Sequence, residues 1–349
     1  MNAQKGKKKK SGTGIWILLS VLLVLGAGAA VAYKVFGPNT GDMHKGEYLY
    51  IPTGASYMLV YDELVTGGYI DDAASFDILA KRANYPSMVK AGKFKIKKGT
   101  SNYDLIRKLR SGRQEPVKLV INKLRTKEDF IDIVSNNLEP DSAEIAGVLN
   151  DNSFLATHGF DTNTAMAAVI PDTYEFYWNT SAEKVYTRLA EYYKKYWTDD
   201  RVALADSLGL TPKEVIILAS IVEEETNKND EKSNVASVYL NRIKKNMPLQ
   251  ADPTVKYAVG DFAIKRVLKV HTEFDSPYNT YMYAGLPPGP INTPSKATLN
   301  AVLHTEPTDY LYFCAKEDFS GYHNFASNYN EHMKNARAYQ KALNEAGIK

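Results

Sequence analysis

The chain has 349 residues, of which 44% are hydrophobic and 24% charged, the balance of an ordinary globular protein of about two or three domains. Its formal net charge is only +3, and lysines crowd the first ten residues, so a basic body that binds nucleic acid is excluded. The single cysteine, Cys314, excludes an intramolecular disulfide, and the scattered histidines form no zinc-type cluster. We therefore expect no metal ion and no cofactor.

The segment Ile15–Tyr33 is almost wholly apolar and carries no charge. A helix of 19 residues spans roughly 28 Å at about 1.5 Å per residue, close to the hydrocarbon thickness of a bilayer. The lysines precede it, so the sequence predicts a cytoplasmic basic tail over residues 1–14, a transmembrane helix over residues 15–34 and a body outside the inner membrane. A cleaved signal peptide is the alternative, favoured by the alanines at the end of the segment.

Residues 35–46 are polar and turn-rich and are predicted to be a linker. After them, apolar spacing indicates a small unit of strands and helices, whose last helix is capped by Ser101 or Asn102 and ended by Gly112. The predicted elements are a strand over Tyr48–Ile51, helices over Met58–Val65 and Ser75–Ala83, a strand within Ala91–Thr100 and a helix over Tyr103–Leu109.

A strand over Val117–Asn122 and helices over Thr126–Asn137 and Ser142–Leu149 are expected next, without residues that suggest chemistry. The segment Ile170–Trp178 then places several aromatic residues around Asp172 and a second carboxylate. Aromatic rings stack on sugar faces and carboxylates accept hydrogen bonds from sugar hydroxyls, so this composition suits carbohydrate. A core corner with hydrogen-bonded polar tips fits the composition equally well.

A helix with a strong start signal follows: Thr211 is a capping residue, Pro212 suits the first turn and Glu214 completes a capping box. Its run Val215–Val222 is apolar on every face, which predicts a helix buried all round. The helix ends in three carboxylates, Glu223–Glu225. The helix dipole and partial burial both disfavour charge there, so we expect a raised carboxyl pKa, as a general acid needs. Small side chains one turn earlier favour the first carboxylate, whereas a solvated charge run is the alternative.

A second helix is predicted over Ser233–Lys245, followed by a turn-rich loop over Met247–Thr254. Three side chains of this loop are able to hydrogen-bond hydroxyls or amides: Gln250, Asp252 and Thr254. The segment Ser276–Asn292 is so rich in proline and glycine that we expect a rigid loop, and long ordered loops are more often functional. The remaining predicted elements are a helix over Lys296–Leu303, a strand over Tyr310–Ala315 and a helix over Asn328–Ala346.

Four segments resemble, in order and spacing, the motif series of the endolytic murein transglycosylase (MltG, YceG-like) family: Ala219–Thr226, Leu249–Thr254, Ser276–Tyr281 and Gly285–Ile291. The apolar N-terminal segment matches as well, and the small unit after it looks like the family's LysM-like portion. The resemblance covers most of the chain beyond the linker. One departure is Ala326, which stands after the Gly-Tyr-His-Asn-Phe segment where the family has serine.

The resemblance implies an α+β fold with a single N-terminal transmembrane helix, a LysM-like subdomain over residues 47–120 and a larger α+β catalytic domain over residues 121–349, beginning with a helical connecting region over residues 121–165. It implies a lyase that cuts the MurNAc–GlcNAc bond of nascent peptidoglycan strands, leaves 1,6-anhydro-MurNAc ends and limits strand length during cell-wall synthesis. The implied partners are peptidoglycan strands, the cytoplasmic membrane and, as candidates, peptidoglycan synthases (penicillin-binding proteins).

The motif match gives Glu223 the catalytic position. The other candidates are expected to contact substrate: Gln250, Asp252, Thr254, Tyr278, Asn279, Tyr281, Glu225 and Asp172. One carboxyl suffices for this reaction because the sugar's own 6-hydroxyl attacks. Two alternatives remain. A water-using glycoside hydrolase would need a second carboxylate, for which Asp252 is the candidate. A non-catalytic scaffold would bind the wall through the LysM-like unit.

Overall fold

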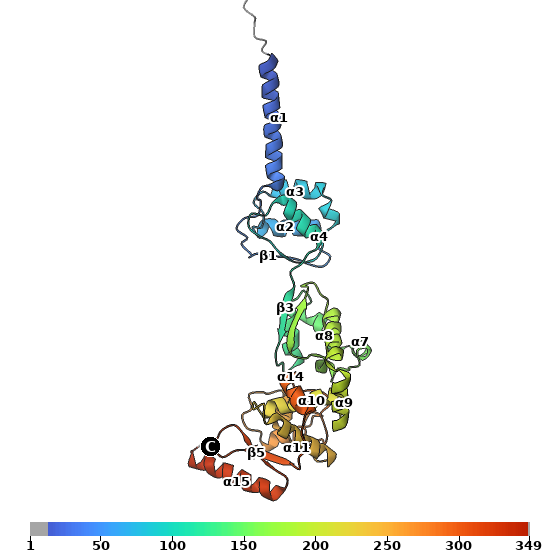
Figure 1. The fold of residues 1–349 in the computed structure, drawn as a ribbon, viewed down its shortest axis with the longest axis vertical. Coiled ribbons are helices and arrows are strands. Elements are labelled where there is room, and N and C mark those ends of the chain that lie inside the picture. Colours follow the sequence, from blue (N-terminus) through green and yellow to red (C-terminus); the bar gives the residue numbers. More distant parts are fainter. Residues whose placement is uncertain (1–12, 348–349) are drawn as a thin grey trace, which may run out of the picture. The chain divides into compact units, whose positions relative to one another are not determined.

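The computed structural model describes residues 13–347, and the chain divides into two compact units (Figure 1). The first unit comprises the described residues up to Val117 together with Tyr177–Asn179, and the second comprises the others from Lys118 onward. Over the described residues the fold consists of helices and three two-stranded sheets. The predicted class, α+β with one N-terminal apolar helix, is therefore confirmed.

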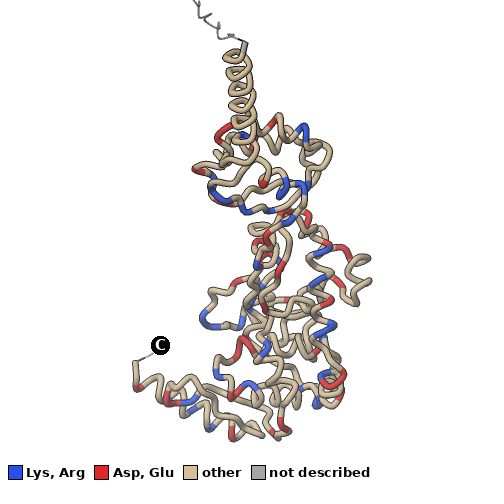
Figure 2. Tube along the Cα trace, turned by 45° about the horizontal axis from the view of Figure 1, so that its top comes forward, with Lys and Arg blue, Asp and Glu red and all other residues tan. Residues whose placement is uncertain are grey.

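The N-terminal helix α1 (Thr13–Phe36) is long and apolar enough to cross a membrane, with a mean hydropathy of 2.5 in its apolar window. None of that window is buried against the rest of the protein, so its leucines, valines and isoleucines face outward. In Figure 2, α1 is tan along almost its whole length, whereas charged positions are spread over the rest of the chain. The lysines at positions 5 to 10, which the orientation prediction uses, lie outside the described residues.

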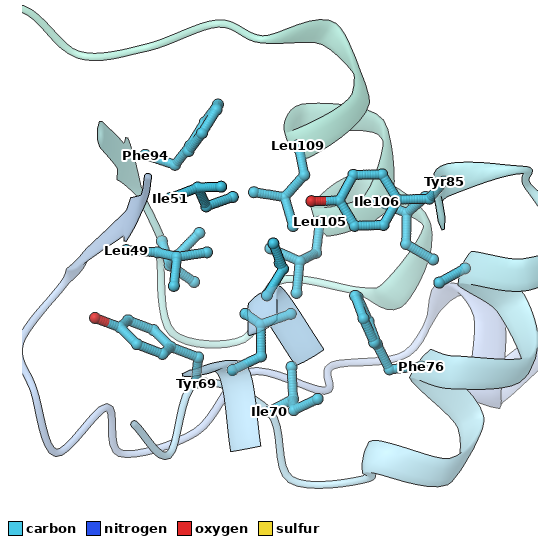
Figure 3. Close-up of a cluster of buried hydrophobic side chains, with 14 of the residues drawn as sticks. Leu49, Ile51, Tyr69, Ile70, Phe76, Tyr85, Phe94, Leu105, Ile106 and Leu109 are labelled. Atoms are coloured by element: carbon cyan, nitrogen blue, oxygen red, sulfur yellow. The ribbon is translucent and has the colours of Figure 1, made fainter. Parts of the chain in front are cut away.

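In the first unit, strand β1 (Tyr48–Ile51) pairs antiparallel with β2 (Gly92–Lys95), with Ile51 opposite Gly92. Three helices after α1 complete the unit, and Ser101 is the residue that caps the last of them. Leu49, Phe94 and Leu105 lie in its buried core, which Figure 3 shows. The predicted strands and helices of this unit are confirmed, with shifts of a few residues at their ends. Its other elements are α2 (Tyr57–Thr66), α3 (Ala73–Arg82), the 3-10 turn η1 (Tyr85–Ser87) and α4 (Asn102–Ser111).

The second unit contains two hairpin-sized sheets, β3 (Val117–Ile121) with β4 (Asp172–Phe176) and β5 (Tyr312–Ala315) with β6 (His323–Ala326). Its other elements are α5 (Lys127–Ser135), α6 (Ser142–Asn150), α7 (Asn152–Thr157), η2 (Ala165–Ala168), α8 (Ala182–Tyr196), α9 (Asp199–Leu208), α10 (Pro212–Glu225), α11 (Lys232–Lys244), α12 (Asp252–Val259), α13 (Lys269–Thr272), α14 (Lys296–Leu303) and α15 (Tyr329–Glu345).

Helix α10 is the centre of this unit. The prediction that Val215–Val222 is buried on every face is confirmed, and α10 packs against α9, α11, α12 and α14. Because its flanks are covered by protein, α10 presents polar side chains only at its two ends, and the C-terminal turn carries the three carboxylates. A helix so placed holds its last residues rigidly, which suits a site that needs fixed geometry.

Two sequence predictions need correction. The loop predicted over Met247–Thr254 ends early, because α12 begins at Asp252: Pro253 suits a first helical turn, and Gly260, in the left-handed conformation, ends the helix. Helices α8 and α9 were not predicted at all. The signal for α8 was present, since its buried residues Val185, Tyr186, Leu189 and Ala190 recur at helical spacing.

Candidate active site

The site is built around the C-terminal turn of α10. The capping box of Thr211 and Glu214 is formed, so the start of the helix is fixed as the sequence predicts. Near its other end, the Ser220 hydroxyl accepts a hydrogen bond from the Ile291 backbone N–H at 3.0 Å, and the Asn292 amide donates to the Ser220 carbonyl at 2.8 Å. The proline- and glycine-rich loop is thereby fastened to α10 just before its three carboxylates.

The Glu223 carboxylate is held by three donors. Lys232 Nζ lies 3.3 Å from Glu223 Oε2, the Ser295 hydroxyl donates to it at 3.0 Å, and the Thr298 hydroxyl donates to the same oxygen. The Glu223 side chain is only 15% exposed and that of Lys232 only 6%. Lys232 also donates to the Thr298 hydroxyl at 2.7 Å. The four side chains form one small, largely buried polar network.

The elements behind this network explain its geometry. Lys232 is the first residue of α11, and Ser295 is the N-cap of α14, with its hydroxyl accepting from the Thr298 backbone N–H. The positive end of the α14 dipole therefore faces Glu223. Sequence reasoning missed these three residues. The Ser-x-x-Thr pattern at the start of α14 was a readable helix cap, but nothing near Lys232 in the sequence indicated that it pairs with Glu223.

The prediction of a raised carboxyl pKa is wrong for Glu223. Burial alone would raise the pKa of Glu223 and is the largest single influence, but the Thr298 hydrogen bond, the Lys232 charge and the Ser295 hydrogen bond together lower it. The sequence argument considered only the C-terminal end of α10, whereas the tertiary structure adds a buried cation and the N-terminus of a second helix.

The raised pKa belongs instead to Glu225. Burial raises the pKa of Glu225 to about 7, and the charge of Asp252 adds to this, although a 2.7 Å hydrogen bond from the Tyr239 hydroxyl opposes it. The carboxylate between the two, Glu224, lies 3.0 Å from Lys123 Nζ. Three consecutive glutamates thus enter three different environments, and Glu223 and Glu225 have pKa values displaced in opposite directions.

Other candidates gather at the start of α12. The Tyr281 hydroxyl donates to Asp252 at 2.6 Å, and Asp252 is exposed. The buried Thr254 hydroxyl donates to the Ala251 carbonyl and contacts the Thr280 hydroxyl at 2.8 Å. Gln250, exposed and with a positive φ of 53°, donates its backbone N–H to the Thr280 carbonyl. Hence Asp252, Tyr281 and Gln250 have accessible polar groups, whereas Thr254 holds the loop together.

Asn279 and Tyr278 belong to the rigid loop itself. The Asn279 side chain is buried and donates to the carbonyls of Thr272 and Phe274, so its role here is to shape the loop. The Tyr278 ring lies 4.8 Å from that of Tyr257, centroid to centroid. A Cβ at Gly289 would come within 2.0 Å of the Asn163 carbonyl oxygen, so only glycine fits where the loop passes.

Asp172, the candidate from the aromatic segment, lies on β4. Lys296 Nζ is 2.6 Å from Asp172 Oδ2, and the Tyr192 hydroxyl donates to the same oxygen. The Lys296 hydrogen bond and then that of Tyr192 lower the pKa of Asp172 to about 2. Because Lys296 directly follows Ser295, the start of α14 contacts both Asp172 and Glu223. Among residues 13–347, no group of His, Cys, Asp or Glu side chains is arranged to hold a metal ion.

These features define a mixed helix-and-sheet protein whose buried central helix ends in carboxylates with shifted pKa values, as in many enzyme active sites. The chain belongs to the YceG-like family, whose model matches residues 49–338. It is 29% identical over 357 residues to a Bacillus subtilis protein named endolytic murein transglycosylase, covering 93% of each chain. A Streptococcus pneumoniae D39 protein of the same name is 26% identical over 91% of this chain, which spans 63% of that longer relative. The family prediction is therefore confirmed.

A solved structure agrees with this membership. The crystal structure of a YceG-like protein from Listeria monocytogenes superposes with a TM-score of 0.56 at 28% identity, covering 82% of this chain and 98% of that one. The similarity extends over both sequence and fold, and does not rest on the four short motifs alone.

Proposed function

We propose that this chain is a peptidoglycan lytic transglycosylase that cuts the MurNAc–GlcNAc bond within nascent strands, with Glu223 as both acid and base. Family membership and the names of the relatives support the activity. The observation that carries the residue assignment is the position of Glu223: a largely buried carboxylate at the end of a rigid helix, oriented by Lys232, Ser295 and Thr298.

The reaction needs only one such group. A protonated Glu223 gives its proton to the GlcNAc O4 as the bond from that oxygen to the MurNAc C1 breaks. The MurNAc O6 then bonds to C1, and the Glu223 carboxylate takes the proton from that hydroxyl. The products are a GlcNAc with a free 4-hydroxyl and a 1,6-anhydro-MurNAc end, with no water consumed. The hydroxyls of Ser295 and Thr298 are able to donate or accept, so they fit both protonation states of Glu223.

The surroundings of the other carboxylates favour a lytic transglycosylase over a hydrolase. A water-using glycosidase needs a second carboxylate facing the same bond. Glu224 is engaged by Lys123 and Arg125, and Asp252 accepts from Tyr281 while its charge acts on Glu225. Asp252, Tyr281 and Gln250 are better placed to bind sugar hydroxyls or amides, together with Glu225. We propose that the remaining candidates hold these sugar-binding residues in place: Asp172, Thr254, Tyr278 and Asn279.

We further propose that α1 anchors the protein in the cytoplasmic membrane, with residues 1–14 inside and the body outside. In this arrangement the LysM-like subdomain (residues 47–120) binds glycan and the catalytic domain (residues 121–349) cuts it near the membrane, where strands are made. Peptidoglycan synthases are the candidate protein partners, because a cut within nascent strands limits their length.

The test is the chemistry of the new ends. Full-length protein in detergent is incubated with uncrosslinked glycan strands, and the fragments are analysed by mass spectrometry. We expect 1,6-anhydro ends on fragments of many lengths. Reducing ends, heavier by one water, would identify a hydrolase. Release of disaccharides alone would refute cutting within strands, and binding without any cleavage would favour the scaffold.

A further inference from the structure

A groove lies in the first unit. It has a volume of about 520 Å³, within the range of small-molecule sites, and Val35 from the end of α1 lines it together with Leu79, Met88 and Ile106. The same groove is lined by Arg82, Arg107 and Arg110, and no carboxylate is among its lining residues. An apolar floor with a cationic rim suits an amphiphile that carries a negative charge.

The position of this groove relative to α1 is fixed by contacts within the unit. Lys34 pairs with Asp72 at 2.5 Å, and the Asn102 side chain donates to the Lys34 carbonyl at 2.9 Å. Two residues of the segment predicted as a linker also bond to the unit: the Asn39 amide donates to Asn102, and the Thr40 hydroxyl donates to the Lys97 carbonyl. The end of α1 is therefore attached to this unit.

If α1 spans the bilayer over residues 15–34, Val35 lies where the hydrocarbon core meets the headgroup layer. The headgroup layer is roughly 5–7 Å thick on each side of the bilayer. The Phe36 and Tyr103 rings lie 5.5 Å apart, and Tyr103 is 48% exposed, as is typical of aromatic residues at a membrane interface. A groove lined by Val35 and Tyr103 consequently opens within the headgroup layer.

Two of the three arginines lack partners that would neutralise them. Among residues 13–347, Arg82 and Arg110 form no ion pair, and the buried Nε of Arg110 has no hydrogen-bond acceptor. A buried donor without an acceptor calls for an explanation, and an anion bound in the groove would accept its hydrogen bond. Arg107 pairs with Asp104 at 3.1 Å at the surface. Guanidinium groups bind phosphate through two parallel hydrogen bonds, which makes a phosphodiester the matching anion.

We propose that this groove binds an anionic phospholipid of the membrane that α1 spans, with the phosphate on Arg82, Arg107 and Arg110 and the start of an acyl chain along Leu79, Met88 and Ile106. The bound lipid fastens the first unit to the membrane surface. This inference rests on the membrane anchoring proposed above, but not on the glycan chemistry.

The test uses the full-length protein, purified in a zwitterionic detergent and stripped of lipid. Native mass spectrometry follows the binding of phosphatidylglycerol and of phosphatidylcholine with the same acyl chains. A basic residue near anionic lipid contributes roughly fivefold in affinity, so we expect the first phosphatidylglycerol to bind at least about tenfold more tightly than phosphatidylcholine. The triple variant R82Q/R107Q/R110Q should lose this preference.

A matched control removes the same charge elsewhere in the unit. The triple variant K90Q/K97Q/R113Q neutralises three exposed cations that do not line the groove, and it should keep the preference. Equal loss in both variants would mean diffuse attraction and would overturn the site, as would an unchanged preference in R82Q/R107Q/R110Q. Circular dichroism checks that each variant is folded.

Photo-crosslinking locates the lipid. Phosphatidylglycerol with a diazirine in its acyl chain should label peptides of α3 and α4 in the wild type and lose that label in R82Q/R107Q/R110Q; labelling of α1 alone would refute the groove. A different result would show that α1 does not anchor the protein, because alkaline carbonate would then release the protein from membranes. Glycan cleavage is measured separately and does not depend on either result.

Discussion

Replacing Glu223 by glutamine tests the centre of the proposed chemistry. The amide has nearly the shape of the acid but neither gives nor takes a proton at the sugar oxygens. Loss of a general acid or base costs about 10²–10⁴ in rate, and here one group serves both steps, so we expect the upper end of that range or more. The measurement is the appearance of 1,6-anhydro fragments over time by mass spectrometry.

The structure adds a stability cost to the same substitution. In E223Q the Lys232 ammonium, with a side chain only 6% exposed, faces a neutral amide and keeps only its 2.7 Å hydrogen bond to Thr298. Removing one partner of a buried ion pair costs roughly 3–5 kcal/mol, and because one hydrogen bond of Lys232 remains we expect a loss of about 3 kcal/mol. The double variant E223Q/K232M, without the buried charge, should recover most of this, which hydrogen exchange of α10 and α11 peptides would measure.

The matched control is Glu224→Gln, in the same helical turn. Its carboxylate pairs with Lys123 and Arg125, so its loss should change the cleavage rate only a few-fold. If folded E223Q cleaved glycan at a rate within a few-fold of the wild-type rate, the assignment of Glu223 as the catalytic residue would be wrong. If the stability losses of E223Q and K232M simply added, Glu223 and Lys232 would not be energetically coupled, and the account of the lowered pKa would fail.

Three further outcomes are expected. Because the pKa of Glu223 is lowered, the cleavage rate should fall as pH rises through the acidic range. The variant K232M should raise the pKa of Glu223 and so move this fall in rate to higher pH. A fall in the wild-type rate near pH 7 would instead identify Glu225 as the acid. The pKa of Glu225 is about 7 in the folded protein and about 4.3 in the unfolded chain, so the folded state loses stability as pH rises from the lower to the higher value. The variant E225Q removes this loss, so it should raise the melting temperature at pH 8 more than at pH 5. Protease added to intact spheroplasts should digest the body but spare a tag at Met1, whereas a released product lacking Ile15–Tyr33 would indicate a cleaved signal.

Much of this protein follows from local sequence. The apolar helix α1, the capped helix α10 with its buried run Val215–Val222 and the irregular loop over Ser276–Asn292 were all predictable, because each depends on residues close together in the chain. Capping, hydropathy and the backbone restrictions of proline and glycine act over a few residues. The four motifs were also enough to identify the family, although they could not show what each side chain touches.

The electrostatic state of the carboxylates was decided only by the tertiary structure. Glu223 receives hydrogen bonds from residues 9, 72 and 75 positions away, so the sequence near it predicted the wrong direction for its pKa. Glu225, two residues further on, faces Tyr239 and the charge of Asp252 instead. A pKa depends on every charge and dipole within a few ångströms, and in a packed protein most of these come from distant parts of the chain.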